Sequence, residues 1–195
     1  MNEQIKFVPK IEKIWETILY VVHKRPNTDH YTISKLIYLS DREHFRRYGR
    51  PITFDRYAAL PYGPVPSNAL NMLKRAGGQE GGETALRAMG IKDIPFEVTT
   101  LDKNLVFHTP KRDPLLKKFS KSDLRVLDDI VAKYGDKKFY DLYQITHRHF
   151  AYTNAWGNRR AEGKRSAPIA YEDMLELSSS YEQQVEDLAF VAPHI

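Results

Sequence analysis

Residues 36–66 read LIYLSDREHFRRYGRPITFDRYAALPYGPVP, and this stretch decides the fold because it predicts a helix, a strand and a turn with no spare residues between them. If the helix begins near Thr32, about 100° per residue places Ser40 and His44 on its apolar face and Asp41 at the margin. Polar groups in such a position are costly unless they are hydrogen-bonded. This end of the helix should therefore hold a defined polar network or line a cleft.

The helix should end at Gly49, with Pro51 beyond it as a stop signal. Residues 52–59 alternate between two faces and predict a strand. Residues 60–66, LPYGPVP, follow as a turn in which three prolines restrict the backbone angle φ. Little conformational entropy is left for such a loop to lose, so we expect it to be preorganised.

The rest of the chain predicts further helices and one hairpin. Residues 96–100 and 105–108 should form a β-hairpin, and the glycine-rich residues 77–90 a flexible connection or flap. Apolar periodicity and capping residues predict helices over 9–23, 67–77 (capped by Ser67), 122–135, 138–149 (with Phe139 and Tyr143 facing inward) and from Tyr171 onward. Residues 157–168 should form a loop. The expected fold is mostly helical α+β, with about six helices around a small antiparallel sheet.

The composition predicts one globular domain over residues 1–195, and its last part should form an acidic helix over about 171–190. The chain has 42% hydrophobic and 28% charged residues and a net charge of +5, which is ordinary for a soluble protein. It has no cysteine, no apolar run that would span a membrane and no apolar leader at its start. We therefore expect the protein in the cytoplasm.

A metal or acid-base site is conceivable at Asp41, Glu43 and His44, since carboxylates and imidazole on one helix can converge. A zinc-protease helix, however, carries two histidines four residues apart, and this turn has one. His147 and His149 are two residues apart and would point about 200° apart on a helix. We therefore predict a structural polar network of Ser40, Asp41, His44 and His147, and no metal site.

Enzyme motifs are missing from the sequence. It has no G-x-S-x-G serine elbow and no G-x-x-x-x-G-K-[ST] phosphate loop. The absence of cysteine also excludes a thiol nucleophile. We expect no catalytic residues and no cofactor.

Two binding functions remain open. The order of helix, helix, strand, helix and hairpin is loosely that of a winged helix, but the third helix offers only Lys74 and Arg75 to DNA. A DNA-binding transcriptional regulator is therefore the alternative hypothesis. The rigid aromatic and proline residues suit a protein interface, although Tyr62 could equally pack internally. The partner-binding candidates are Arg42, Arg46, Tyr57, Tyr62 and Pro64.

The same residues carry a family resemblance. Residues 35–41 (KLIYLSD) with His44, residues 48–52 (YGRPI) and residues 60–66 resemble the central signature of the Panacea domain, also called the SocA-like antitoxin domain. Thr146-His147, with Trp156 downstream, resembles the C-terminal motif of that family. The resemblance covers roughly residues 9–157.

This resemblance implies a function. Panacea domains occur in bacterial and prophage toxin–antitoxin pairs and neutralise a toxic protein encoded beside them, usually by direct binding and without catalysis. The leading hypothesis is therefore an antitoxin whose partner is a cognate toxin from an adjacent gene, with a possible oligomer of the two. The second helix and the LPYGPVP turn would form or support the toxin-binding surface.

Overall fold

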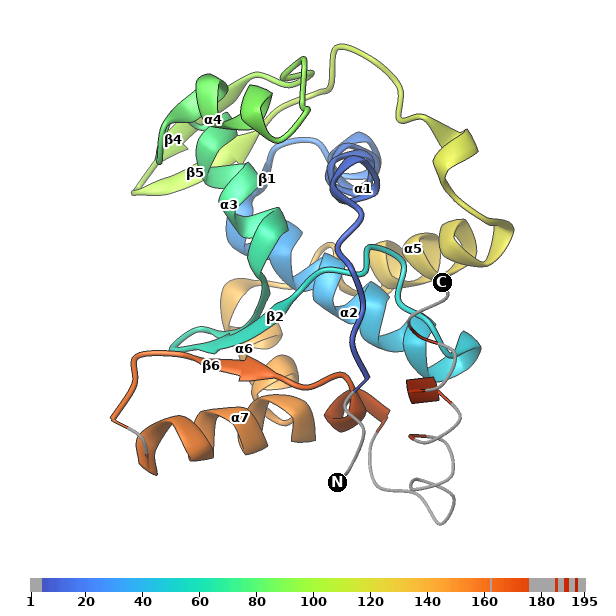
Figure 1. Ribbon diagram of the computed structural model, residues 1–195. Coiled ribbons are helices and arrows are strands. Elements are labelled where there is room, and N and C mark those ends of the chain that lie inside the picture. Colours follow the sequence, from blue (N-terminus) through green and yellow to red (C-terminus); the bar gives the residue numbers. More distant parts are fainter. Residues whose placement is uncertain (1–4, 162, 176–184, 186–187, 190–191, 193–195) are drawn as a thin grey trace.

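The computed structural model describes residues 5–161, 163–175, 185, 188, 189 and 192. This part of the chain forms seven α-helices and two three-stranded antiparallel sheets, so the predicted mostly helical α+β fold is confirmed (Figure 1). The helices are α1 (Ile11–Lys24), α2 (His30–Tyr48), α3 (Ser67–Ala76), α4 (Gly82–Ala88), α5 (Lys121–Tyr134), α6 (Phe139–His147) and α7 (Phe150–Ala161), with 3-10 turns η1 (Leu116–Lys118) and η2 (Glu172–Leu175). The strands are β1 (Thr28–Asp29), β2 (Tyr57–Leu60), β3 (Gly63–Pro66), β4 (Val98–Leu101), β5 (Asn104–Phe107) and β6 (Ala167–Ile169).

Helix α2 lies at the centre of the molecule and packs against α1, α3, α5 and α6 (Figure 1). Its apolar side chains are completely buried, among them Ile33, Leu36 and Ile37. It begins two residues earlier than predicted because Asp29 caps it, accepting the Thr32 backbone N–H at 2.9 Å. It ends where predicted, at a left-handed glycine cap.

The two sheets have the strand orders β1-β5-β4 and β3-β2-β6, and the predicted 96–108 hairpin is β4–β5. In β3, Pro64 and Pro66 alternate with Gly63 and Val65. Because proline has no N–H, only Gly63 and Val65 can donate hydrogen bonds to β2. Both prolines occupy the positions of β3 whose backbone groups point away from β2. On the opposite edge, Pro168 lies in β6. Both edges of the sheet β3-β2-β6 thus carry prolines that discourage an added strand.

The predicted strand over 52–59 forms only at its end, as β2. Earlier in this segment the backbone N–H groups of Ile52 and Thr53 donate to the Asp41 carboxylate at 2.9 and 3.0 Å. Phe54 adopts a positive φ of 59°, which ends any extended run. A side chain on α2 has therefore taken the hydrogen bonds that a neighbouring strand would have made.

Helix α3 is capped by a side chain distant in sequence and not, as predicted, by Ser67. Pro66 occupies the N-cap position and supplies no side-chain hydrogen bond. Instead, the Asp55 carboxylate accepts the backbone N–H groups of Asn68 at 3.0 Å and Ala69 at 2.9 Å. A carboxylate also interacts favourably with the positive end of a helix dipole.

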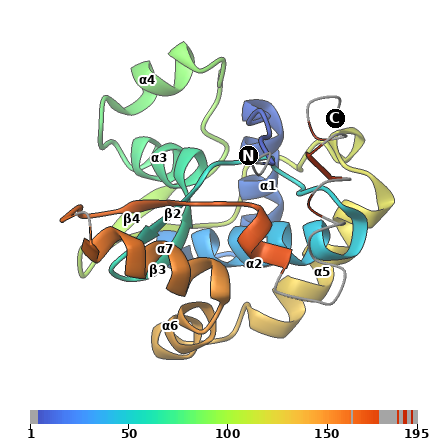
Figure 2. The ribbon, with the colours of Figure 1, turned by 60° about the horizontal axis from the view of Figure 1, so that its bottom comes forward.

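Three further elements differ from the sequence prediction. The glycine-rich segment contains α4, and residues 150–169 hold α7 and β6 where only a loop over 157–168 was predicted. Helices α6 and α7 lie along the sheet β3-β2-β6 (Figure 2). The predicted acidic helix begins as η2, and most of its remainder lies outside the described residues.

Candidate protein-binding surface

The hairpin formed by β2 and β3 is anchored by a buried lysine. Lys35 lies on α2 with none of its surface exposed, and its Nζ donates to the Pro64 carbonyl at 2.7 Å. This carbonyl belongs to the outer edge of β3, so the lysine satisfies a group that no strand pairs. Burial lowers the pKa of Lys35 to about 7, and within the described part of the chain no carboxylate forms an ion pair with its amine.

This lysine makes stability depend on pH. The unfolded chain keeps the lysine proton to about pH 10.4, whereas folded Lys35 loses it near pH 7, so raising the pH between these values disfavours unfolding. From about pH 7.5 to 9.5 we expect the free energy of unfolding to rise by about 2 kcal/mol more in the wild type than in Lys35→Met. Urea unfolding of both proteins at the two pH values measures the difference.

The groups facing Lys35 do not titrate in the folded protein over that range. Burial, aided by the Lys35 charge, lowers the pKa of His147, although its backbone hydrogen bonds oppose this. Burial also raises the pKa of Tyr31, whose ring lies 4.9 Å from the lysine Nζ. Parallel pH profiles for wild type and Lys35→Met would show that the lysine is not the source of the effect.

Gly63 lies close against side chains of α2 and α6. It has a φ of +100°, and a Cβ built on it would lie 2.9 Å from Lys35 Nζ, 3.0 Å from Thr146 Oγ1 and 3.1 Å from His147 Cε1. The Thr146 hydroxyl is itself held by donation to the Leu142 carbonyl at 2.8 Å. Only glycine combines this backbone conformation with such close packing.

Side chains from α6 and α7 hold the carbonyls at the hairpin tip. Tyr152 donates its hydroxyl to the Leu60 carbonyl at 3.0 Å. His147 Nε2 lies 3.4 Å from the Pro61 carbonyl, and His147 Nδ1 lies 2.8 Å from the Tyr143 carbonyl. The tip is therefore in contact with side chains of two helices.

A continuous set of aromatic rings surrounds this tip. The Phe139 ring lies 6.0 Å from Tyr62, 4.5 Å from Tyr31 and 6.1 Å from Tyr143. Tyr143 stacks on His147 at 3.6 Å. These contacts connect the hairpin, the first turn of α2 and α6 into one aromatic assembly.

Two rings of this assembly, and Tyr140, which directly follows Phe139 in α6, are exposed to a degree unusual for aromatic residues. Tyr62 is 64% exposed, Phe139 50% and Tyr140 68%. We call these three residues the tip surface. Clusters of exposed apolar side chains on a rigid support are typical of protein interaction sites.

Asp41 forms a second, fully buried cluster below β2. Its carboxylate accepts the Tyr57 hydroxyl at 2.5 Å, the Thr53 hydroxyl and the two backbone N–H groups of Ile52 and Thr53. Burial raises the pKa of Asp41, while these hydrogen bonds oppose the rise. The cluster fixes the connection between α2 and the hairpin.

His44 belongs to another cluster, centred on Asp123 of α5. His44 Nε2 lies 3.1 Å from the Asp123 carboxylate, which also accepts Lys13 at 2.7 Å and Arg50 at 2.9 Å. Burial alone would raise the pKa of Asp123, but the hydrogen bonds from His44 and Lys13 hold it well below its usual range. This cluster joins α1, α2 and α5.

The structure separates the four residues predicted to form one polar network. Asp41 and His44 lie in the two clusters just described, and His147 lies at the hairpin tip. Ser40 Oγ is buried and, within the described residues, has no hydrogen-bond partner. The expectation of a single network at the end of α2 is corrected accordingly, because successive turns of α2 face different elements.

Of the predicted partner-binding residues, Tyr62 and Arg46 are exposed. Tyr57 is only 3% exposed, with its hydroxyl bonded to Asp41, and Pro64 and Arg42 are also buried. These three residues are therefore not exposed parts of a binding surface.

The sequence reasoning missed the contribution of α6. Phe139 was predicted to face inward, and its 50% exposure shows that this was wrong. The sequence contains one signal of an exposed aromatic side chain, the pair Phe139-Tyr140 at the start of a helix. Adjacent helical residues point about 100° apart, so these two rings cannot both face one core. The motif over residues 35–41 contains Lys35, but the sequence does not predict that its side chain is completely buried.

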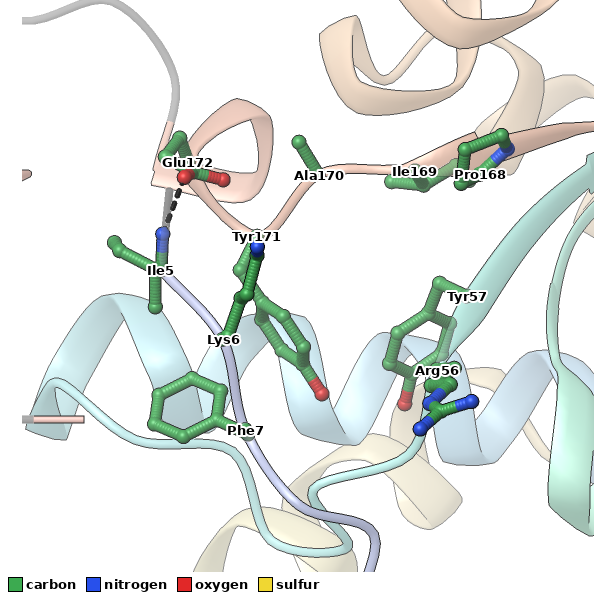
Figure 3. Close-up of a pocket in the computed structure, with 10 residues that line it drawn as sticks. All are labelled: Ile5, Lys6, Phe7, Arg56, Tyr57, Pro168, Ile169, Ala170, Tyr171 and Glu172. Atoms are coloured by element: carbon green, nitrogen blue, oxygen red, sulfur yellow. Dashed lines mark hydrogen bonds between the residues drawn. The ribbon is translucent and has the colours of Figure 1, made fainter. Parts of the chain in front are cut away.

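A cavity of about 530 Å³ lies between the N-terminal segment and β6 (Figure 3). The Phe7 ring at this cavity packs edge-on against Tyr171 at 4.9 Å. The cavity is lined by Ile5, Lys6, Phe7, Arg56, Tyr57, Pro168, Ile169, Ala170, Tyr171 and Glu172, and it shares none of them with the tip surface. It is therefore a separate feature of the molecule.

The side chains considered for acid-base chemistry do not converge. Asp41 and His44 are completely buried in separate clusters, away from His147. Among the residues that the structure describes, no three histidine, aspartate or glutamate side chains are grouped as metal ligands would be. The helices of this described part include none with the length and apolarity needed to cross a membrane.

Comparisons with known proteins agree with the signature described above. A search of curated proteins and a search of solved structures each returned no match. A protein-family model described as "Antitoxin SocA-like, Panacea domain" matches residues 33–152, which is more than half of the chain and includes α2, the hairpin, α6 and the start of α7. The chain therefore belongs to the SocA-like antitoxin family of Panacea domains.

Proposed function

We propose that this chain is an antitoxin that neutralises a toxin encoded by an adjacent gene, by binding the toxin directly in the cytoplasm and without catalysing a reaction. Membership of the SocA-like family supports the antitoxin role. The observation that carries direct binding is the tip surface, in which Tyr62, Phe139 and Tyr140 are exposed beside a hairpin held by side chains of three helices.

The anchoring of the hairpin favours binding energetically. A partner that docks on a mobile loop must order it, and each immobilised side chain costs roughly 0.5–1.5 kcal/mol. Here the hairpin carbonyls are already held by Lys35 and Tyr152. Aromatic anchors on such a support are the side chains that most often dominate the free energy of protein binding.

The test is co-expression with the product of the adjacent gene. The wild-type chain is expected to restore growth and to co-purify with that product. The triple variant Tyr62→Asp, Phe139→Asp, Tyr140→Asp is expected to lose affinity by about 100-fold or more, because charged groups replace apolar anchors. Its circular dichroism should stay that of the wild type, and its unfolding midpoint should fall only modestly, because all three side chains are at least half exposed and the lost packing is that of the Phe139 ring on its neighbours.

A matched control uses exposed apolar residues elsewhere. Tyr48 is 44% exposed and Leu101 is 64% exposed, and neither belongs to the tip surface. The double variant Tyr48→Asp, Leu101→Asp should bind the toxin like the wild type. If the triple variant also binds normally, toxin binding does not use the tip surface; if the wild type neither rescues growth nor co-purifies, the antitoxin proposal is wrong.

A further inference from the structure

Lysine and arginine side chains border the tip surface. Their positive charge indicates which kind of partner segment can dock there. Lys137 and Lys138 directly precede the exposed aromatic pair of α6, and Arg148 directly follows the last residue of this helix. All three are exposed. The nine residues of α6 span about 14 Å, so the cations lie within reach of one docked segment.

The aromatic and basic side chains on and beside α6 form one continuous surface. Taking Phe139 as the origin, successive residues turn by about 100°, which places Tyr140 at about 100° and Arg148 at about 180° around α6. Tyr140 therefore lies between the aromatic side of the helix, which faces Tyr62, and the basic side. A partner that covers Tyr140 meets both.

In the described part of the chain, three cations outnumber the one nearby carboxylate, that of Asp141, that has no ion-pair partner. Asp136 forms an ion pair with Arg25, and Asp141 accepts the Lys138 backbone N–H at 3.3 Å at the start of the helix. No carboxylate in the described part of the chain forms an ion pair with Lys137, Lys138 or Arg148. Residues 60–63 of the hairpin tip carry no charged side chain. The exposed border of the tip surface is therefore positively charged.

We infer that the toxin segment that docks on the tip surface presents apolar side chains flanked by carboxylates. This inference rests on the proposed function and adds the chemistry of the partner. The apolar side chains cover Tyr62, Phe139 and Tyr140, while the carboxylates lie against Lys137 and Arg148. Complementary charges at the rim of an interface mainly accelerate association, and this acceleration weakens as salt is added.

The test measures association rates of the purified chain with the product of the adjacent gene by surface plasmon resonance. The variant Lys137→Glu, Arg148→Glu should associate about 10-fold or more slowly than the wild type at low salt. The difference should shrink toward high salt, because ions screen exposed charges. The aromatic side chains are unchanged in this variant, so its dissociation rate should change far less.

A control variant separates a local effect from a change in total charge. Lys92 and Lys111 are exposed, follow α4 and β5, and have no ion-pair partner in the described residues. The variant Lys92→Glu, Lys111→Glu changes the net charge by the same amount and should keep the wild-type association rate within about twofold.

The possible results are distinct. Slow, salt-sensitive association of the Lys137→Glu, Arg148→Glu variant alone supports an acidic partner. Equal slowing of both variants, no slowing, or faster association of Lys137→Glu, Arg148→Glu overturns the inference while toxin binding itself stands. If the wild type forms no complex, the proposed function fails first.

Discussion

Replacing Asp41 with alanine is expected to lower the free energy of unfolding by about 4 kcal/mol, one of the two largest effects anticipated for a single substitution in this chain. The variant leaves the Tyr57 hydroxyl, the Thr53 hydroxyl and two backbone N–H groups without their acceptor. Asp41 is completely buried, so water cannot replace the carboxylate without opening the structure. Urea or thermal unfolding measures the loss.

Asp129 provides the control for Asp41. Its side chain is 53% exposed and makes one ion pair, with Arg47 at 3.4 Å. Exposed pairs of this kind contribute about 0–1 kcal/mol, so Asp129→Ala should unfold nearly like the wild type. A loss below about 1 kcal/mol for Asp41→Ala would show that the four hydrogen bonds are not jointly important to the fold.

Replacing Gly63 with alanine is expected to cost about 3 kcal/mol and to move the hairpin tip. A left-handed backbone angle strains any residue with a Cβ, by about 1 kcal/mol or more. Overpacking adds about 1–3 kcal/mol, because the new methyl group would meet Lys35, Thr146 and His147 at distances of 2.9 to 3.1 Å. The unfolding midpoint and the affinity for the toxin should fall together.

A substitution at Gly90 separates the cost of backbone strain from the cost of overpacking. It has a φ of +84°, but a Cβ there would have no neighbour within 4 Å. Gly90→Ala should therefore show the backbone strain alone, about 1 kcal/mol, and leave toxin binding unchanged. If Gly63→Ala and Gly90→Ala lose the same stability, the contacts under the hairpin are softer than the structure indicates.

These substitutions and those at the tip surface separate the stability of the fold from the binding of a partner. Asp41, Gly63 and Lys35 hold the hairpin against the helices, so changing them alters stability and, through it, binding. Tyr62 and Tyr140 are exposed, so changing them should alter binding with little effect on stability. Measuring both quantities for each variant tests this division.

Much of the fold could be predicted from local sequence signals. Helix α2 ends at Gly49 as expected, since a glycine cap followed by proline acts within a few residues. The β4–β5 hairpin formed with a two-residue turn at Asp102 and Lys103. The motifs of residues 35–66 with Thr146-His147 also indicated the family that the family comparison shows.

Other features depend on partners distant in the sequence, and local rules could not reveal them. The strand predicted over 52–59 was lost largely because Asp41 on α2 accepts the backbone N–H groups of Ile52 and Thr53. In the same way, Asp55 replaces the predicted cap of α3. In both cases a carboxylate from another part of the chain accepts the backbone N–H groups that the locally predicted strand or cap would have used.

The sequence by itself determined most of the helices, the β4–β5 hairpin and the family, because periodicity, caps and turn residues act over a few residues. Only the tertiary structure decided which residues reach the surface. Tyr57 is buried and Phe139 is exposed, the reverse of the sequence-based expectation for both. The physical reason is that exposure depends on which elements pack over a side chain, and α6 reaches the hairpin tip through contacts about 80 residues apart in the chain.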